Sequence, residues 1–168
     1  MAELREMAEE HGTVEFDGLH EMRDALSAVL TLTERSIDIL SRNLDPRLFD
    51  DAHIIGELKR VALASRRARV RILVHDTGML TRRDSRVWAM MRRLPTYFQI
   101  RVPSRDHRNL PKAFLIADKV ATLYQANAEL YEGQAEFYDP IRGDSLGRQF
   151  MEIWEAAEPS PDLRTMTM

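Results

Sequence analysis

The stretch that decides the fold runs from Asn109 to Asn127 and consists of NLPKAFLIADKVATLYQAN. Two short apolar segments, AFLIA and VATLY, flank Asp118 and Lys119. Apolar runs of this length bounded by turn residues predict two buried β-strands joined by a tight turn. The ends of such strands often hold ligand sites in α/β proteins. Here, however, the positions leading into the first strand include Pro111 and Ala113.

Strand and helix alternate in the part of the chain that precedes this stretch. Hydrophobic periodicity predicts strands at 13–16, 36–40, 70–74 and 97–102 and helices near 19–30, 54–67 and 80–94. After the stretch it predicts further sheet at 130–138, interrupted at Gly133, and a helix from about 144. This order predicts a single α/β domain at 13–157, built on a mixed β-sheet flanked by helices. A flexible acidic leader at 1–12 and a C-terminal tail at 158–168 are expected around it.

The composition excludes several kinds of site. The chain has 168 residues, is 44% hydrophobic and 30% charged, and contains no cysteine, which removes disulfides, thiolate zinc sites and cysteine nucleophiles. No apolar run approaches the roughly 18 residues of a membrane span, and the acidic N-terminus is unlike a signal peptide. The cytoplasm is therefore the expected location. No cofactor is predicted.

Charge is distributed unevenly along the chain. Residues 1–57 carry 5 basic and 14 acidic groups, residues 58–119 carry 16 and 4, and residues 120–168 carry 3 and 9, for a total of −3. The cationic middle can form a surface for anions or nucleic acid. It can also pair with the acidic flanks, within one chain or across a dimer.

Four segments together resemble one half of a phospholipase D-like protein. They are ERSIDILS (34–41), ARVRILVHD (68–76), AFLIADKVATLYQAN (113–127) and FMEIW (150–154). In that family a strand carries the pattern H-x-K-x-x-x-x-D, and two copies meet to form one phosphodiester-cleaving site. The resemblance implies a phospholipase D-like fold and, because single-motif members form half of such an enzyme, a homodimer.

The motif itself is degenerate in this sequence. The resemblance places Pro111 where the family has histidine and Ala113 where it has lysine, while Asp118 and Asn127 keep their positions. Tyr124 and Gln125 replace the glycine and serine that normally follow. Residues two apart on a strand point the same way, so histidine and lysine reach one phosphate together. Neither proline nor alanine can attack phosphorus or stabilise the charge that develops.

Other residues offer weaker candidates for chemistry. A shifted site would use His107, Lys112 and Asp118, although Lys112 is one residue out of register and would face the opposite side of a regular strand. His75 and Asp76 end a strand and suit either a ligand or a loop contact. His11, His20 and His53 show no metal-ligand spacing, so no metal site is predicted.

Three functional hypotheses follow. The first is a catalytically inactive phospholipase D-like domain that serves as a binding or assembly module, so that enzyme activity is not favoured but stays open. The second is an active phosphodiesterase or nuclease with the shifted site. The third is nucleic-acid binding without cleavage through an arginine-rich face, formed by Arg82, Arg83, Arg86 and Arg93 with Arg66 and Arg67, since arginine supplies phosphate contacts.

Overall fold

The computed structural model describes residues 2, 6, 10, 12–159 and 163 of the chain. Most of the expected leader at 1–12, His11 included, and most of the expected tail at 158–168 lie outside the described residues. Among the described helices, none combines the length and the hydrophobicity that a membrane span requires.

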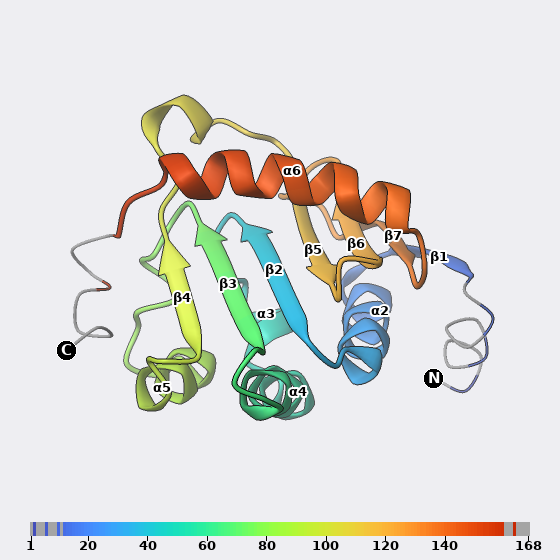
Figure 1. Ribbon diagram of the computed structural model, residues 1–168, viewed down its shortest axis with the longest axis horizontal. Helices are drawn as coiled ribbons and strands as arrows, with labels where there is room; N and C mark the ends of the chain where they lie inside the picture. Colours follow the sequence, from blue (N-terminus) through green and yellow to red (C-terminus); the bar gives the residue numbers. More distant parts are fainter. Residues whose placement is uncertain (1, 3–5, 7–9, 11, 160–162, 164–168) are drawn as a thin grey trace.

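The fold is one mixed seven-stranded sheet between two layers of helices (Figure 1). In chain order the elements are β1 (Thr13–Asp17), α2 (Leu19–Leu32), β2 (Ser36–Ser41), α3 (Pro46–Phe49), α4 (Ala52–Leu63), β3 (Arg69–Val74), α5 (Arg86–Arg93), β4 (Phe98–Arg101), the 3₁₀ turn η1 (Arg105–His107), β5 (Ala113–Ala117), β6 (Ala121–Gln125), β7 (Glu132–Glu136) and α6 (Pro140–Ala156). The predicted fold class is confirmed.

The sheet has the strand order β1-β7-β6-β5-β2-β3-β4. Strands β2, β3 and β4 are parallel, as expected where helices connect them, and the other pairs are antiparallel. The two strands of the decisive stretch form the hairpin β5–β6, with Phe114 opposite Tyr124. Since β5 runs antiparallel to β2, the start of β5 and the end of β2 lie at the same edge of the sheet.

Two hydrophobic clusters hold the layers together. The larger one packs α2, α4 and α5 against one face of the sheet, and the smaller one packs α6 against the other face. A buried ion pair lies next to the smaller cluster, where the Arg71 guanidinium contacts both Asp38 carboxylate oxygens at 2.7 and 3.0 Å. The Arg71 guanidinium also lies 5.4 Å from the centre of the Phe150 ring, so α6 covers the pair.

Three predicted helix boundaries were wrong. The helix expected at 54–67 ends at Leu63, because the chain turns at Ser65, whose hydroxyl accepts the Arg67 and Ala68 N–H groups at 3.2 and 3.1 Å. The helix expected from residue 80 begins only at Arg86, because the Ser85 hydroxyl and the Asp50 carboxylate accept its first backbone N–H groups. The last helix begins at Pro140, ahead of the expected Asp144, because Asp139 caps it by accepting the Arg142 N–H at 3.0 Å.

Gly133 belongs to strand β7, where the sequence predicted an interruption of the sheet. It pairs with Phe16 of β1. A Cβ atom at this position would collide with the Tyr124 carbonyl and approach the Phe16 ring. Glycine is therefore required here because backbone and ring pack directly on it.

Candidate functional site

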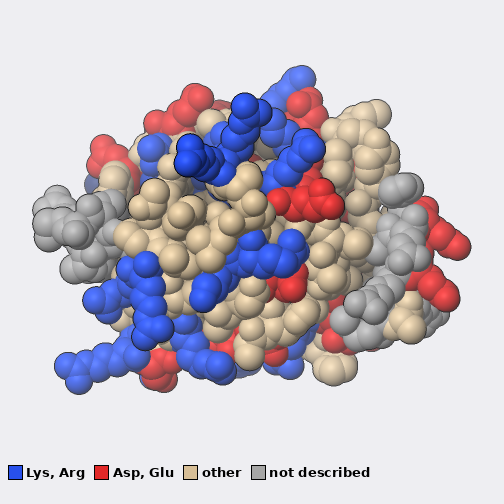
Figure 2. Space-filling view, turned by 60° about the horizontal axis from the view of Figure 1, so that its bottom comes forward, with Lys and Arg blue, Asp and Glu red and all other residues tan. Residues whose placement is uncertain are grey.

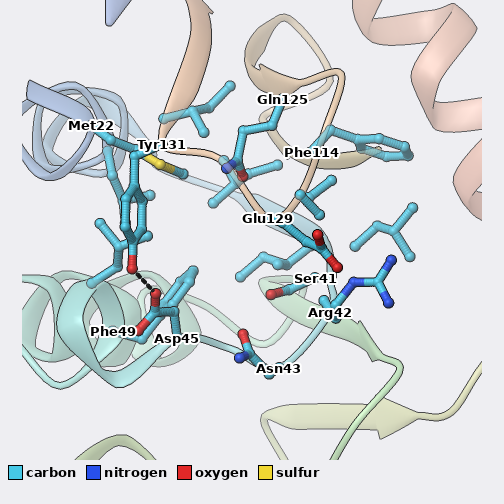
Figure 3. A pocket seen from close by; sticks show the side chains of 18 residues that line it. Met22, Ser41, Arg42, Asn43, Asp45, Phe49, Phe114, Gln125, Glu129 and Tyr131 are labelled. Atoms are coloured by element: carbon cyan, nitrogen blue, oxygen red, sulfur yellow. Dashed lines mark hydrogen bonds between the residues drawn. The ribbon is translucent and has the colours of Figure 1, made fainter. Parts of the chain in front are cut away.

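The degenerate motif opens onto a pocket of about 280 Å³ at the edge where β2 ends and β5 begins (Figure 3). Its apolar wall comes from α2, α3 and the sheet, with side chains that include Met22, Phe49, Ala113 and Leu115. The polar groups at its mouth come from the two loops that follow β2 and β6, and they are Ser41, Arg42, Asn43, Asp45, Glu129 and Tyr131. Gln125 reaches the pocket from the end of β6. A cavity of this size holds a small molecule.

A hydrogen bond joins the two loops across the pocket. The Tyr131 hydroxyl donates to the Asp45 carboxylate, which also caps α3 by accepting the Arg47 N–H at 3.0 Å. Burial raises the pKa of Tyr131, and the hydrogen bond to Asp45 raises that pKa further. Tyr131 is therefore a neutral donor at physiological pH, and its hydrogen bond to Asp45 links the two loops at the mouth of the pocket.

Of the motif positions that replace catalytic groups, one lies in the pocket. Ala113 is 6% exposed and its methyl group forms part of the wall. Pro111 is exposed outside the pocket, where its carbonyl accepts the Ala128 N–H at 2.7 Å. The pocket is lined by no histidine and no lysine among the described residues.

The residues that follow the motif fix the loop between β6 and β7. The Gln125 side chain donates to the Leu130 carbonyl at 2.7 Å. The Asn127 side chain accepts the Glu129 N–H at 3.0 Å. Tyr124 lies on the other side, with the Arg142 guanidinium 4.6 Å from its ring centre. Gln125 and Asn127 thus fix by local contacts the loop that carries Glu129 and Tyr131 to the pocket.

Asp118 lies at the far end of β5 and makes structural contacts. Its carboxylate accepts the backbone N–H groups of three consecutive residues, 34–36, at 2.9, 2.7 and 3.0 Å. Its φ of +53° is a left-handed conformation that aspartate tolerates. Asp118 therefore joins the β5–β6 turn to the start of β2.

The structure does not bring the three residues of the shifted site together. Lys112 donates to the Gln149 side chain of α6. His107 lies in the loop before β5, 3.2 Å from the Ser104 hydroxyl. Asp118 is separated from Lys112 by the whole of β5, which for five residues is roughly 17 Å.

A second pair of polar side chains, Arg42 and His75, lies where β2 and β3 end. Burial lowers the pKa of His75, and the positive charge of Arg42 lowers it further. The sequence indicated His75 as a strand-end residue but gave no reason to choose Arg42, which becomes its neighbour only through strand pairing. The described residues contain no cluster of three or more His, Cys, Asp or Glu side chains that could hold a metal ion.

The arginine-rich face remains largely without acidic partners. Arg82 lies 3.6 Å from Asp84, but Arg83, Arg86 and Arg93 form no ion pair within the described part of the chain. Arg86 and Arg93 line a groove between α4 and α5 together with Lys59. Figure 2 shows Lys and Arg side chains gathered on this side of the molecule, over the region of α5. Arg66 and Arg67 follow α4, outside the groove.

Solved structures with the same fold have low sequence identity to this chain. TrmBL2, an archaeal chromatin protein described as showing a novel mode of DNA binding, matches with a TM-score of 0.63 at 16% identity over 88% of this chain. The match covers 53% of TrmBL2, so this chain spans about half of its length. At these identities the similarity establishes the fold.

Two bacterial structures match over nearly their whole length. Nuc from Salmonella typhimurium, a phospholipase D family member, gives a TM-score of 0.59 at 15% identity, and NucT from Helicobacter pylori gives 0.56 at 13%. Each match covers 88% of this chain and 98% of the other. The predicted phospholipase D-like fold is thereby confirmed.

No curated protein sequence matches the chain significantly. A family model, described as a domain of unknown function, matches residues 18–166 and so includes nearly every element of the fold. The chain therefore belongs to the DUF7931 family and has a phospholipase D-like fold.

Proposed function

We propose that this domain binds a small ligand in the pocket at the degenerate motif and does not cleave phosphodiesters. The observation that carries this proposal is the Ala113 methyl group in the pocket wall, where the family resemblance places a catalytic lysine. An alanine side chain cannot stabilise charge on phosphoryl oxygens. The pocket nevertheless stays open and has polar groups at its mouth, which suits binding.

Cleavage assays test this proposal against the shifted-site hypothesis. The purified protein is incubated with single-stranded nucleic acid, a phospholipid and an aryl phosphodiester, beside the His107→Ala and Lys112→Ala variants. We expect background hydrolysis from all three proteins, because His107 and Lys112 contact Ser104 and Gln149 outside the pocket. Turnover by the wild-type protein that either variant loses would establish the shifted site instead.

Nucleic-acid binding without cleavage is a second candidate. Lys59, Arg86 and Arg93 border one groove and have no acidic partner among the described side chains, so their charges are available to phosphates. The fold is shared with TrmBL2, whose structure was described as showing a mode of DNA binding. A surface of this kind contacts the phosphate backbone and is insensitive to sequence.

The salt dependence of binding tests this candidate. Affinity for a fluorescent oligonucleotide is measured over a range of salt concentrations for the wild type, Arg86→Gln and Arg93→Gln. Each substitution is expected to reduce the log–log salt slope by roughly 0.7 to 0.9, the value for one lost phosphate contact. Arg148→Gln is the control, because Arg148 lies on α6 and pairs with Asp144 at 2.9 Å. No binding at low salt, or equal effects of all three substitutions, would exclude this surface.

We also propose that the protein is cytoplasmic and that it forms a homodimer. The homodimer follows from the resemblance to one half of a two-motif enzyme, in which the motif face needs a second copy. Light scattering after size exclusion tests it, and a monomer mass at micromolar concentration would contradict it.

A further inference from the structure

Arg42 and His75 are brought side by side by the parallel pairing of β2 and β3. The register of these strands ends with Ser41 opposite Val74, and the ladder continues beyond it. The His75 N–H donates to the Ser41 carbonyl at 3.2 Å, and the Asp76 N–H donates to the Arg42 carbonyl at 2.7 Å. Arg42 and His75 are therefore the next opposed pair, on strands spaced about 4.8 Å apart.

Three side-chain nitrogens of this pair are shielded from solvent and lack a hydrogen-bond partner in the described chain. They are Nε of Arg42 and both ring nitrogens of His75. Polar groups in that state are uncommon and each carries a desolvation penalty. The arrangement therefore suits a bound group that can accept hydrogen bonds from both side chains.

Within the part of the chain that the structure describes, no acidic side chain supplies that acceptor. None of the ion pairs between described residues includes Arg42 or His75. The Asp76 carboxylate accepts the Gly78 N–H at 2.9 Å. Asp38, two strand positions before Leu40, is neutralised by Arg71. Glu129 lines the same pocket as Arg42 (Figure 3), but the ion pairs between described residues do not include these two side chains.

Arg42 also lines the pocket, and its guanidinium lies at the side of the rim where Phe114 is found (Figure 3). A ligand in the pocket can thus extend one group over the rim toward Arg42 and His75. We propose that Arg42 and His75 together bind an oxyanion, a phosphate or carboxylate group, carried by the ligand whose body occupies the pocket. This inference rests on the proposed binding function and names the chemical class of its ligand.

The oxyanion would accept from the Arg42 Nε–H and from one His75 ring nitrogen. Hydrogen bonds between a guanidinium and an oxyanion are about twice as strong as neutral ones. A negative charge beside the imidazole favours its protonated form. Binding is therefore coupled to the uptake of a proton by His75, and the Arg42 charge opposes that uptake until the anion is present.

Nuclear magnetic resonance with the full chain tests the inference, using inorganic phosphate and acetate as probes and sodium chloride as the ionic-strength control. We expect phosphate or acetate at millimolar concentration to move the Arg42 Nε–H and His75 ring signals saturably and to raise the pKa of His75. The probe that saturates at the lower concentration identifies the anion as phosphate-like or carboxylate-like. Absence of any saturable shift with both probes would overturn the inference.

Substitutions separate a binding role from a structural one. Arg42→Gln is expected to weaken binding of the preferred probe about tenfold or more, and His75→Gln about threefold or more. Arg35→Gln, which removes an exposed charge at the opposite edge of the sheet, should leave binding unchanged. Arg42→Lys keeps the positive charge but lacks the guanidinium Nε–H. A folded Arg42→Lys variant that binds the probe more weakly than the wild type would show that the loss comes from the missing donor and not from a folding defect. Equal weakening by Arg42→Gln and Arg35→Gln would contradict a defined site.

These experiments distinguish failure of the oxyanion site from failure of the proposed non-catalytic function. If phosphodiester turnover were found while phosphate still shifted Arg42 and His75, the non-catalytic proposal would fall and the oxyanion site would stand. If no turnover and no saturable shift were found, the oxyanion site alone would fall.

Discussion

Replacing Asp118 should lower the free energy of unfolding, because the role of its carboxylate is structural and not catalytic. The carboxylate accepts three backbone N–H groups from residues 34–36. At about 1 kcal/mol for each bond, their loss costs about 3 kcal/mol. Alanine adds about 1 kcal/mol because φ at this position is +53°. The Asp118→Ala variant should therefore lose about 4 kcal/mol of unfolding free energy, or roughly 8 to 16 °C in Tm.

Two further substitutions divide this effect into its parts. Asp118→Gly loses the same three bonds but accepts the backbone conformation, so it should lose about 3 kcal/mol. Asp118→Asn keeps the oxygen that binds the N–H groups of Arg35 and Ser36 and loses only the bond to Glu34, at about 1 kcal/mol. The expected order of stability is Asn above Gly above Ala.

Urea unfolding followed by circular dichroism measures these differences. Lys119→Gln is the control, because the exposed Lys119 side chain makes no hydrogen bond in the described chain, and it should stay within about 0.5 kcal/mol of the wild type. An Asp118→Ala variant as stable as Lys119→Gln would refute the structural role given to this carboxylate.

Three other predictions concern the core, pH and assembly. Arg71→Ala should cost about 3 to 5 kcal/mol by leaving Asp38 buried and unpaired, whereas Asp38→Leu with Arg71→Met should cost far less; similar losses in urea unfolding would contradict this. The pKa of His75 in the folded protein lies below its ordinary value of 6.5, so the unfolded state binds more protons just below pH 6.5. The free energy of unfolding should therefore fall as the pH drops through this range. His75→Gln should flatten that dependence, and unchanged slopes would count against it. Because the proposed homodimer buries the motif face, where Leu130 of the β6–β7 loop is 46% exposed, Leu130→Asp should give a monomer by light scattering, and an unchanged dimer mass would place the interface elsewhere.

The sequence predicted the elements whose apolar periodicity is strong. The hairpin around Asp118 and the strands expected at 36–40 and 70–74 form as predicted, and the last helix is present, although it begins earlier than predicted. The predicted start of α5 was wrong. Ser85, which caps the helix, is a local signal that the prediction missed, and the Asp50 carboxylate, which also fixes this start, lies 36 residues earlier in the chain than Arg86. A contact over that separation leaves no local signal in the sequence.

The candidate site was predictable only in part. The motif resemblance indicated the edge that Ala113 occupies, and the pocket lies there. The pairing of Arg42 with His75 depends on strand register, and the Tyr131–Asp45 hydrogen bond depends on two loops that meet in space. Neither relation has a fixed spacing in the sequence. Lys112 could be seen to be out of register, but its contact with Gln149 could not be predicted.

The most direct test of the account is the intact mass of the protein after incubation with an excess of an aryl phosphodiester. A nucleophilic mechanism of the family type would leave a phosphoryl group on a histidine. Because the resemblance places Pro111 where that histidine belongs, and no histidine of the described residues lines the pocket, we predict an unchanged mass. A phosphoryl adduct on any histidine of this chain would contradict it.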